Sequence, residues 1–331
     1  MRLLTLSTAF LLVGLVLTAP TSNDDNLMIT QDFFPESLII YRAQHDIVNI
    51  LIPLNALNFE DNNDDDGNSN ANNIIFFVEA DTNEKGERVD QGLYVLKNGN
   101  ATKLLDNGRE AAAANDDTKT VYFAAKDGLY SYNAETNKAE KYGQVNDDLI
   151  SIAKVNGSEV IYVLTADRVL YKVTEQGTKK EKIDAVVNAK RIVLDYQNNL
   201  FYYTTANEVY VYTDDKVKKI EGLPENLTYL DILKPPFILD NGIPVVVDGK
   251  SYTAYENGTS EVSDIELQVT PTAYSLEATL IQYYGYNKNI YEFNILTILF
   301  GEILTQLKDF LSDKSDAIQS VATRSRGDFG A

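Results

Sequence analysis

Residues 120–143 read TVYFAAKDGLYSYNAETNKAEKYG, two short runs of β-branched and aromatic residues separated by Lys-Asp-Gly and followed by a polar turn. Nearly the same phrase returns as EVIYVLTADRVLYKVTEQGTKKEKID at 159–184 and as NLFYYTTANEVYVYTDDKVKKIEG at 199–222. One tyrosine in each repeat marks its phase: Tyr94, Tyr130, Tyr171, Tyr210 and Tyr252. These tyrosines are 36, 41, 39 and 42 residues apart. Periods near forty residues with several short strands per unit are typical of propeller blades.

Each unit predicts four strands. A first strand, such as 149–156 or 190–197, ends at a polar turn, and a continuous apolar second strand follows. Such runs suit inner strands that are covered on both faces. A third strand alternates Tyr with Val, and the fourth is rich in Lys and Glu, which protect an exposed edge against aggregation. Gly128 and Gly249 supply the positive φ that tight hairpins need.

Five units lie between about residues 73 and 264. The strand-like segments 36–55 and 272–294 are expected to join as one composite blade that closes the ring. The predicted fold is therefore an all-β, six-bladed β-propeller over residues 20–294, with seven blades as the alternative. A β-sandwich or an open solenoid is the other architecture that this pattern allows.

Four segments lie outside the repeat. Residues 1–19 read as a secretory signal peptide, so the mature chain is expected to be extracellular. Residues 59–73 are acidic and rich in Asn, as in a disordered surface loop. Apolar residues at helical spacing predict a C-terminal amphipathic helix over 295–313, docked on the propeller or offered to a protein partner. A largely disordered tail, 314–331, follows and contains the tripeptide Arg326-Gly327-Asp328, a weak match to an integrin motif.

The net charge of −20 argues against nucleic acid and anionic membranes as partners. The chain has no Cys, so disulfides and thiolate catalysis are excluded. Sequons for N-glycosylation occur in predicted loops at four asparagines: Asn100, Asn156, Asn226 and Asn257.

Recognisable catalytic chemistry is scarce in the sequence. The single histidine, His45, is expected to be a hydrogen-bonded structural residue. No Gly-x-Ser-x-Gly elbow and no phosphate-binding Gly loop occur. The acidic loop does not match an EF-hand. Counted from Asn62, the twelfth position should be a bidentate Glu but is Asn73. No cofactor and no metal site are predicted.

The ligand-binding candidates are Arg109 and Arg191, near the starts of inner strands, and Asp195. Either arginine could pair with a ligand carboxylate, although a surface or inter-blade hydrogen bond is the simpler role. The inner strands supply few carboxylates at matching positions, with Asp195 the clearest. The central hub is therefore expected to be poor in titratable groups. It is also expected to accept a flat aromatic molecule, because tyrosines near the channel would suit such a ligand.

The blades KTVYFAAKDGLYSYN, SEVIYVLTADRVLYKVT and AKRIVLDYQNNLFYYTTANEVYVYT, then LPENLTYLDILKPPFILDNGIPVVV, resemble the insect ommochrome-binding proteins, secreted haemolymph proteins of moths and butterflies. The resemblance covers roughly residues 73–264 and rests on the run of repeats. It implies a carrier for an ommochrome pigment or a related aromatic metabolite, and it transfers no ligand motif.

Two further functions stay open. A calcium-dependent hydrolase of the propeller lactonase kind would place Glu, Asn and Asp from several blades around a metal. An extracellular structural or interaction protein is the third reading. The paucity of inner-strand carboxylates favours the non-enzymatic binding protein.

Overall fold

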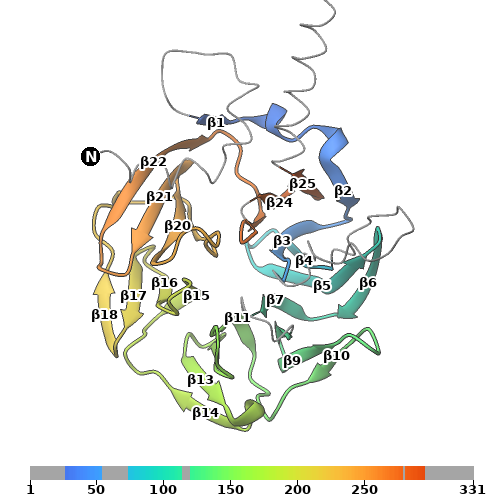
Figure 1. The fold of residues 1–331 in the computed structure, drawn as a ribbon, viewed down its shortest axis with the longest axis vertical. Coiled ribbons are helices and arrows are strands. Elements are labelled where there is room, and N and C mark those ends of the chain that lie inside the picture. Colours follow the sequence, from blue (N-terminus) through green and yellow to red (C-terminus); the bar gives the residue numbers. More distant parts are fainter. Residues whose placement is uncertain (1–26, 54–73, 114–119, 279, 295–331) are drawn as a thin grey trace, which may run out of the picture.

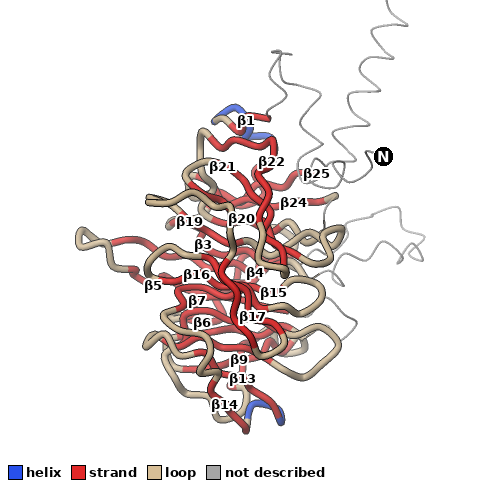
Figure 2. The backbone as a smooth tube through the Cα atoms, turned by 90° about the vertical axis from the view of Figure 1, so that its left-hand side faces the viewer, coloured by secondary structure: helices blue, strands red, loops and turns tan. Residues whose placement is uncertain are grey.

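The strands form six sheets that stand around a common axis, so the chain is a six-bladed β-propeller, as the repeat predicts (Figure 1). The structure is a computed structural model and describes residues 27–53, 74–113, 120–278 and 280–294. The axis runs through the hub, where the innermost strand of each blade lies. Viewed from the side, loops emerge on both faces of the ring, and the hairpin between β4 and β5 projects from one of them (Figure 2).

Blades 1 to 4 follow the chain from the innermost strand outward. Blade 1 contains β3 (Asp46–Leu51), β4 (Ile75–Thr82), β5 (Arg88–Lys97) and β6 (Asn100–Leu105). Blade 2 contains β7 (Gly108–Ala113), β8 (Val121–Ala125), β9 (Gly128–Asn133) and β10 (Lys138–Lys141). Blade 3 contains β11 (Leu149–Lys154), β12 (Ile161–Thr165), β13 (Leu170–Thr174) and β14 (Lys179–Lys182). Blade 4 contains β15 (Ala189–Leu194), β16 (Leu200–Thr204), β17 (Val209–Thr213) and β18 (Lys216–Lys219).

Blades 5 and 6 combine strands from both ends of the described chain. Blade 5 contains β19 (Leu230–Ile232), β20 (Gly242–Val247), β21 (Lys250–Tyr255), β22 (Ser260–Leu267) and, on its outer edge, β1 (Leu27–Ile29). Blade 6 contains β23 (Ala273–Ser275), β24 (Ile281–Tyr286), β25 (Asn289–Asn294) and the outer strand β2 (Ile39–Arg42).

The strand chemistry agrees with this order. Every residue of β8 is buried, whereas every residue of β14 is exposed. The five phase-marking tyrosines all lie on the third strands of their blades, β5, β9, β13, β17 and β21. The β8–β9 hairpin turns at Gly128, whose φ of 135° favours glycine. A Cβ there would lie 2.2 Å from the carbonyl oxygen of Val145, so a side chain does not fit.

Ring closure differs in detail from the prediction. Only β2, from the N-terminal segment 36–55, joins β23–β25 in blade 6, with Ile39 opposite Tyr291 and Arg42 opposite Asn289. The second half of that segment, β3, is instead the innermost strand of blade 1. The sequence shows two strand-like runs here, and a turn at residues 43–45 sends the chain from the rim of one blade to the hub of the next.

A second N-terminal strand was not predicted. Strand β1 pairs in parallel with β22, and Leu27 lies opposite Ile265. Residues 27–42, which we call the N-terminal strap, therefore cover the outer edges of blades 5 and 6 before the chain enters blade 1 (Figure 1).

Aromatic packing fixes the strap between its two strands. Phe34 is buried and its ring stacks on Tyr286, with centroids 4.5 Å apart. Phe33 stacks on Phe293 at 4.5 Å. Two short 3-10 turns, Gln31–Phe33 and Glu36–Leu38, bring these rings onto blade 6.

The predicted signal peptide (1–19), acidic loop (59–73), C-terminal helix (295–313) and tail (314–331) all lie outside the described residues. In the ranges that are described, no helix has the length and apolar character needed to cross a bilayer.

Candidate binding site at the hub

Six side chains occupy equivalent positions on the six innermost strands. They are Asn49, Glu110, Ser151, Arg191, Asp231 and Tyr274. In blades 1 to 4 a β-bulge comes directly before this position. Bulges re-aim the side chain that follows and often occur beside functional sites.

The first three of these side chains form a belt from blade to blade. Each accepts a hydrogen bond from a backbone N–H of the next innermost strand: Ala111 N to Asn49 Oδ1 (3.0 Å), Ile152 N to Glu110 Oε2 (2.8 Å), and Ile192 N to Ser151 Oγ (3.2 Å). Ser151 Oγ also donates to Glu110 Oε2 at 2.5 Å. The belt gives partners to backbone groups that the bulges would leave unpaired.

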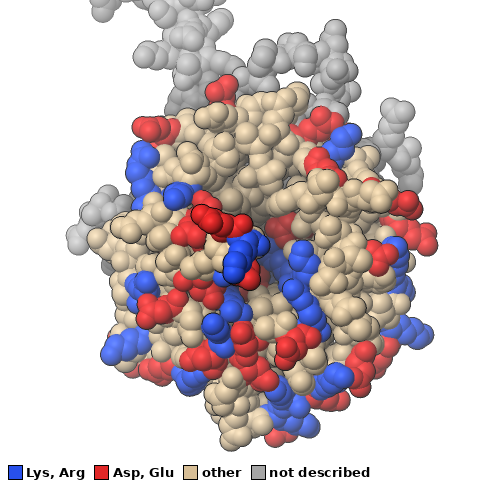
Figure 3. Space-filling model, turned by 180° about the vertical axis from the view of Figure 1, so that it is seen from behind, with Lys and Arg blue, Asp and Glu red and all other residues tan. Residues whose placement is uncertain are grey.

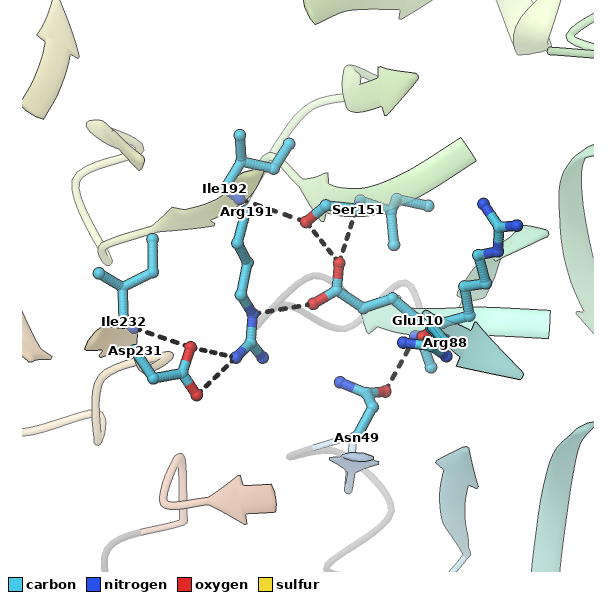
Figure 4. Close-up of polar contacts among 11 residues, drawn as sticks. Asn49, Arg88, Glu110, Ser151, Arg191, Ile192, Asp231 and Ile232 are labelled. Carbon is cyan, nitrogen blue, oxygen red and sulfur yellow. Dashed lines mark hydrogen bonds and ion pairs between the residues drawn. The ribbon is translucent and has the colours of Figure 1, made fainter. Parts of the chain in front are cut away.

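Arg191 cannot accept a hydrogen bond, so at blade 4 the belt changes to ion pairs (Figure 4). Arg191 Nε donates to Glu110 Oε1 at 3.3 Å, and Nη1 donates to both oxygens of Asp231 at 2.7 and 2.9 Å. Burial raises the pKa of Glu110, and Arg191, Ser151 and the N–H of Ile152 oppose that shift. Burial alone would lower the pKa of Arg191, but Asp231 and Glu110 outweigh it and raise the pKa.

A cavity of about 60 Å³ lies on the axis beside the belt, lined by Asn49, Glu110, Arg191 and Tyr274 and by small residues such as Ala112 and Ala153. It has room for about two water molecules at roughly 30 Å³ each, whereas drug-sized ligands need roughly 300 Å³ or more. A flat pigment therefore does not fit inside the hub. One face of the molecule is hollowed at its centre, with charged side chains gathered around the hollow (Figure 3).

A different pair of charges crosses the channel beside the same cavity. Lys234 Nζ, from blade 5, lies 3.5 Å from Glu277 Oε1 of blade 6 and 3.4 Å from the carbonyl oxygen of Ala113 of blade 2. Glu277 Oε2 also accepts from Ser275 Oγ at 2.8 Å. Both residues line the cavity.

Two tyrosines lie close to the Arg191–Asp231 pair. Tyr203 is opposite Arg191 in the β15–β16 register, and Tyr229 comes two residues before Asp231 with 36% of its surface exposed. Burial raises the pKa of Tyr203 to about 12, with Asp231 adding to the shift. The neighbourhood of Arg191 thus offers aromatic surface as well as charge.

The expectation of a hub poor in titratable groups is wrong. Glu110, Arg191 and Asp231 meet there, and Lys234 and Glu277 add a second pair. Sequence reasoning named only Arg191 of these five. In most blades a polar residue stands one or two positions after the first buried residue of the innermost strand. This recurring position is the signal in the sequence that could have identified the hub residues.

Arg109, the second predicted arginine, does not line the cavity. It is a bulge residue that joins three blades: its Nε donates to Asp90 Oδ2 of blade 1 at 3.0 Å, and its Nη1 pairs with Asp148, which precedes β11 of blade 3. The predicted inter-blade role is therefore the one that the contacts show for both arginines.

Asp195 lies in the turn after β15, away from the other two candidates. It is 2% exposed and accepts hydrogen bonds from Asn199 N and Nδ2, both at 2.8 Å. Because these contacts are local to one hairpin, Asp195 shapes the β15–β16 turn and is not part of the hub.

Asp195 should nevertheless make stability depend on pH. Burial raises its pKa from 3.8 to about 6, although bonds from Asn199 oppose the shift. The folded state then prefers the neutral acid, so this stabilising contribution is complete below the unfolded pKa and is lost as pH rises through about 6. The loss is about 3 kcal/mol.

The variant Asp195→Asn should remove this dependence, because its amide is neutral throughout and keeps an acceptor for Asn199 N. Urea unfolding at pH 4, 5, 6 and 7 should show the free energy of unfolding of the wild type falling relative to the variant. A constant difference across that range would contradict the assignment.

The remaining predicted residues lie away from the hub. His45 Nδ1 hydrogen-bonds Asp81 Oδ2 at 2.6 Å beside blade 1. Among the sequons, Asn100, Asn226 and Asn257 are exposed and Asn156 is half-buried. Within the described part of the chain, no group of three or more His, Asp or Glu side chains is placed to hold a metal ion.

Comparisons with known proteins show the fold only. No family model matches the chain. No curated protein matches it either. Among solved structures, a chain of the Kuenenia stuttgartiensis hydrazine synthase is similar at 10% identity and a TM-score of 0.50, over 74% of this chain and 75% of that one. U3-55K matches at 9% identity and 0.49, over 77% and 97%, and the WD40 repeats of RRP9 at 9% and 0.47, over 74% and 88%. At 10% identity, the likeness to the hydrazine synthase chain concerns the fold alone and carries no function.

Proposed function

We propose that this propeller is a secreted, non-enzymatic binding protein that carries an ommochrome-type pigment or a related aromatic metabolite in haemolymph. The observation that carries the proposal is the hub itself, where a quarter of the Arg191 side chain is exposed beside an axial cavity and next to Tyr203 and Tyr229. Tyr203 and Tyr229 offer aromatic surface beside the Arg191 guanidinium, and aromatic surface next to an oriented charge suits a conjugated ligand. The cavity is too small for the ring system, so the rings lie at the channel mouth and a polar substituent enters.

The hub carboxylates already accept hydrogen bonds and ion pairs from the protein, which supports a binding function over a hydrolytic one. Both oxygens of Glu110 accept hydrogen bonds, and both oxygens of Asp231 pair with Arg191. A carboxylate held by a guanidinium is a weak base and a poor ligand for calcium. The calcium-dependent hydrolase therefore gains no support from these residues.

The test is secreted expression in insect cells or purification from native fluid, followed by an absorption spectrum. We expect a visible band that co-purifies with the protein, or, for protein isolated colourless, a red or blue shift of an added ommochrome that saturates at one equivalent. A colourless protein that shifts no pigment spectrum, and whose melting temperature rises only with calcium, would reject the proposal in favour of the hydrolase.

A further inference from the structure

Three residues that line the hub cavity carry a hydrogen-bond donor that has no acceptor among the described residues. Arg191 uses only Nε and Nη1 in its bonds, which leaves Nη2. Asn49 uses Oδ1 to accept from Ala111 N, so its Nδ2 is oriented as a donor, and none of the hydrogen bonds among the described residues uses it. Figure 4 shows Arg191 Nη2 and Asn49 Nδ2 pointing into the space between the two side chains. Tyr274 also lines the cavity, and its hydroxyl is buried without a hydrogen-bond partner in the described part of the chain.

These donors come from different parts of the ring. Asn49 belongs to blade 1, Arg191 to blade 4 on the opposite side of the axis, and Tyr274 to blade 6. Buried polar groups in native proteins nearly always have partners, so an orphaned hydroxyl beside a cavity indicates a missing acceptor. The neighbouring carboxylates do not supply it, because the bonds of Glu110 and Asp231 all go to other donors.

From these donors on residues that line one cavity, we infer that the hub cavity is a carboxylate-binding site, in which Arg191 Nη2, Asn49 Nδ2 and Tyr274 Oη donate to the two oxygens of a ligand carboxylate. Three donors, one of them cationic, match an acceptor-only group that carries one negative charge. The volume agrees: a cavity of about 150 Å³ holds benzene, so about 60 Å³ holds a group of about three heavy atoms.

This inference rests on the proposed function and narrows the ligand to an aromatic carboxylic acid with its acid group on the axis. Two matched probe pairs separate the two claims: benzoate with benzamide, and indole-3-acetate with indole-3-acetamide. Each pair keeps the ring and exchanges only the carboxylate for a neutral amide. Binding is measured at pH 7 by titration calorimetry on the full chain obtained by secreted expression.

We expect each acid to bind about tenfold or more tightly than its amide, as hydrogen bonds to a charged group require. Equal affinities for acid and amide would overturn the carboxylate site and leave the proposed function standing. No binding by either pair, together with no ommochrome binding, would overturn both.

Two variants locate the site. Tyr274→Phe removes one orphan donor and should weaken acid binding about tenfold with no loss of melting temperature, because no existing bond is broken. Asn49→Asp keeps the acceptor for Ala111 N but places a negative oxygen where Nδ2 was, and should abolish acid binding. The matched control is Tyr196→Phe, which also removes a buried unpaired hydroxyl but from a residue that does not line the cavity. If Tyr274→Phe and Tyr196→Phe bind the acids as wild type does, the site is not the hub cavity.

Discussion

A chain that begins at Gln44 is expected to remain unfolded or to aggregate, whereas a chain that begins at Pro20 folds. The shorter chain lacks the N-terminal strap, and with it the outer strand of blade 6, the edge strand of blade 5 and the buried Ile29 and Phe34. Burying one large apolar side chain contributes about 1.5–3 kcal/mol. The strap carries at least five such side chains, buried or half-buried: Ile29, Phe33, Phe34, Leu38 and Ile39. Their loss is comparable to the whole stability of a domain, about 5–15 kcal/mol.

A point variant tests the contribution of the strap to stability by a measurable change in the free energy of unfolding. Phe34→Ala should lower the free energy of unfolding by about 3–5 kcal/mol, because it leaves a cavity among Tyr284, Tyr286 and Tyr291. Denaturant unfolding followed by far-UV circular dichroism measures the change. The control is Met28→Ala in the same strap, where the side chain is 47% exposed and the expected change is below about 0.5 kcal/mol. Similar losses for both variants would mean that the strap does not pack as described.

Replacing Arg191 with methionine should cost about 3–5 kcal/mol, because Glu110 and Asp231 are then left buried without a counter-charge. The Glu110 side chain is 10% exposed and that of Asp231 is 16% exposed, so water screens the pairs little. Arg42→Met provides the comparison, since Arg42 and its partner Glu36 are 58% and 88% exposed and their pair should contribute below about 1 kcal/mol.

A triple variant separates a lost charge pair from a general packing defect. Adding Glu110→Gln and Asp231→Asn to Arg191→Met removes every charge of the cluster, and should recover part of the lost stability because no ion remains unpaired. Thermal and urea unfolding both measure this recovery. A triple variant less stable than Arg191→Met would show that the cost came from lost packing and hydrogen bonds.

Periodicity made the blades predictable. Tyr94, Tyr130 and Tyr171 recur because each third strand packs its tyrosine in the same environment, and a shared environment leaves a repeat in the sequence. The Lys-rich fourth strands could be assigned for the same reason, since all face water. Six blades followed from counting these units and adding one blade made from both ends of the chain.

The hub was less predictable because its residues occupy equivalent positions in their strands but are of different chemical types. Asn49, Glu110, Ser151, Arg191 and Asp231 differ in size and charge, so no residue type repeats. What they share is geometric, a bulge or a register position that turns each side chain to the axis. The sequence favours Asp195 as the clearest carboxylate because it follows an inner strand, but the turn after β15 holds it beside Asn199.

The strap also decides when this protein can become native during its own synthesis. Arg42 pairs with Asn289, so the partner of an early segment leaves the ribosome only after almost the entire propeller has been translated. Until then Phe33 and Phe34 have no aromatic surface to cover them, and they are open to chaperones or to another nascent chain. Closing a loop of this length is entropically slow. We therefore expect the return of the first residues to be a late step of folding, and conditions that delay it to favour exchange of the strap between neighbouring molecules.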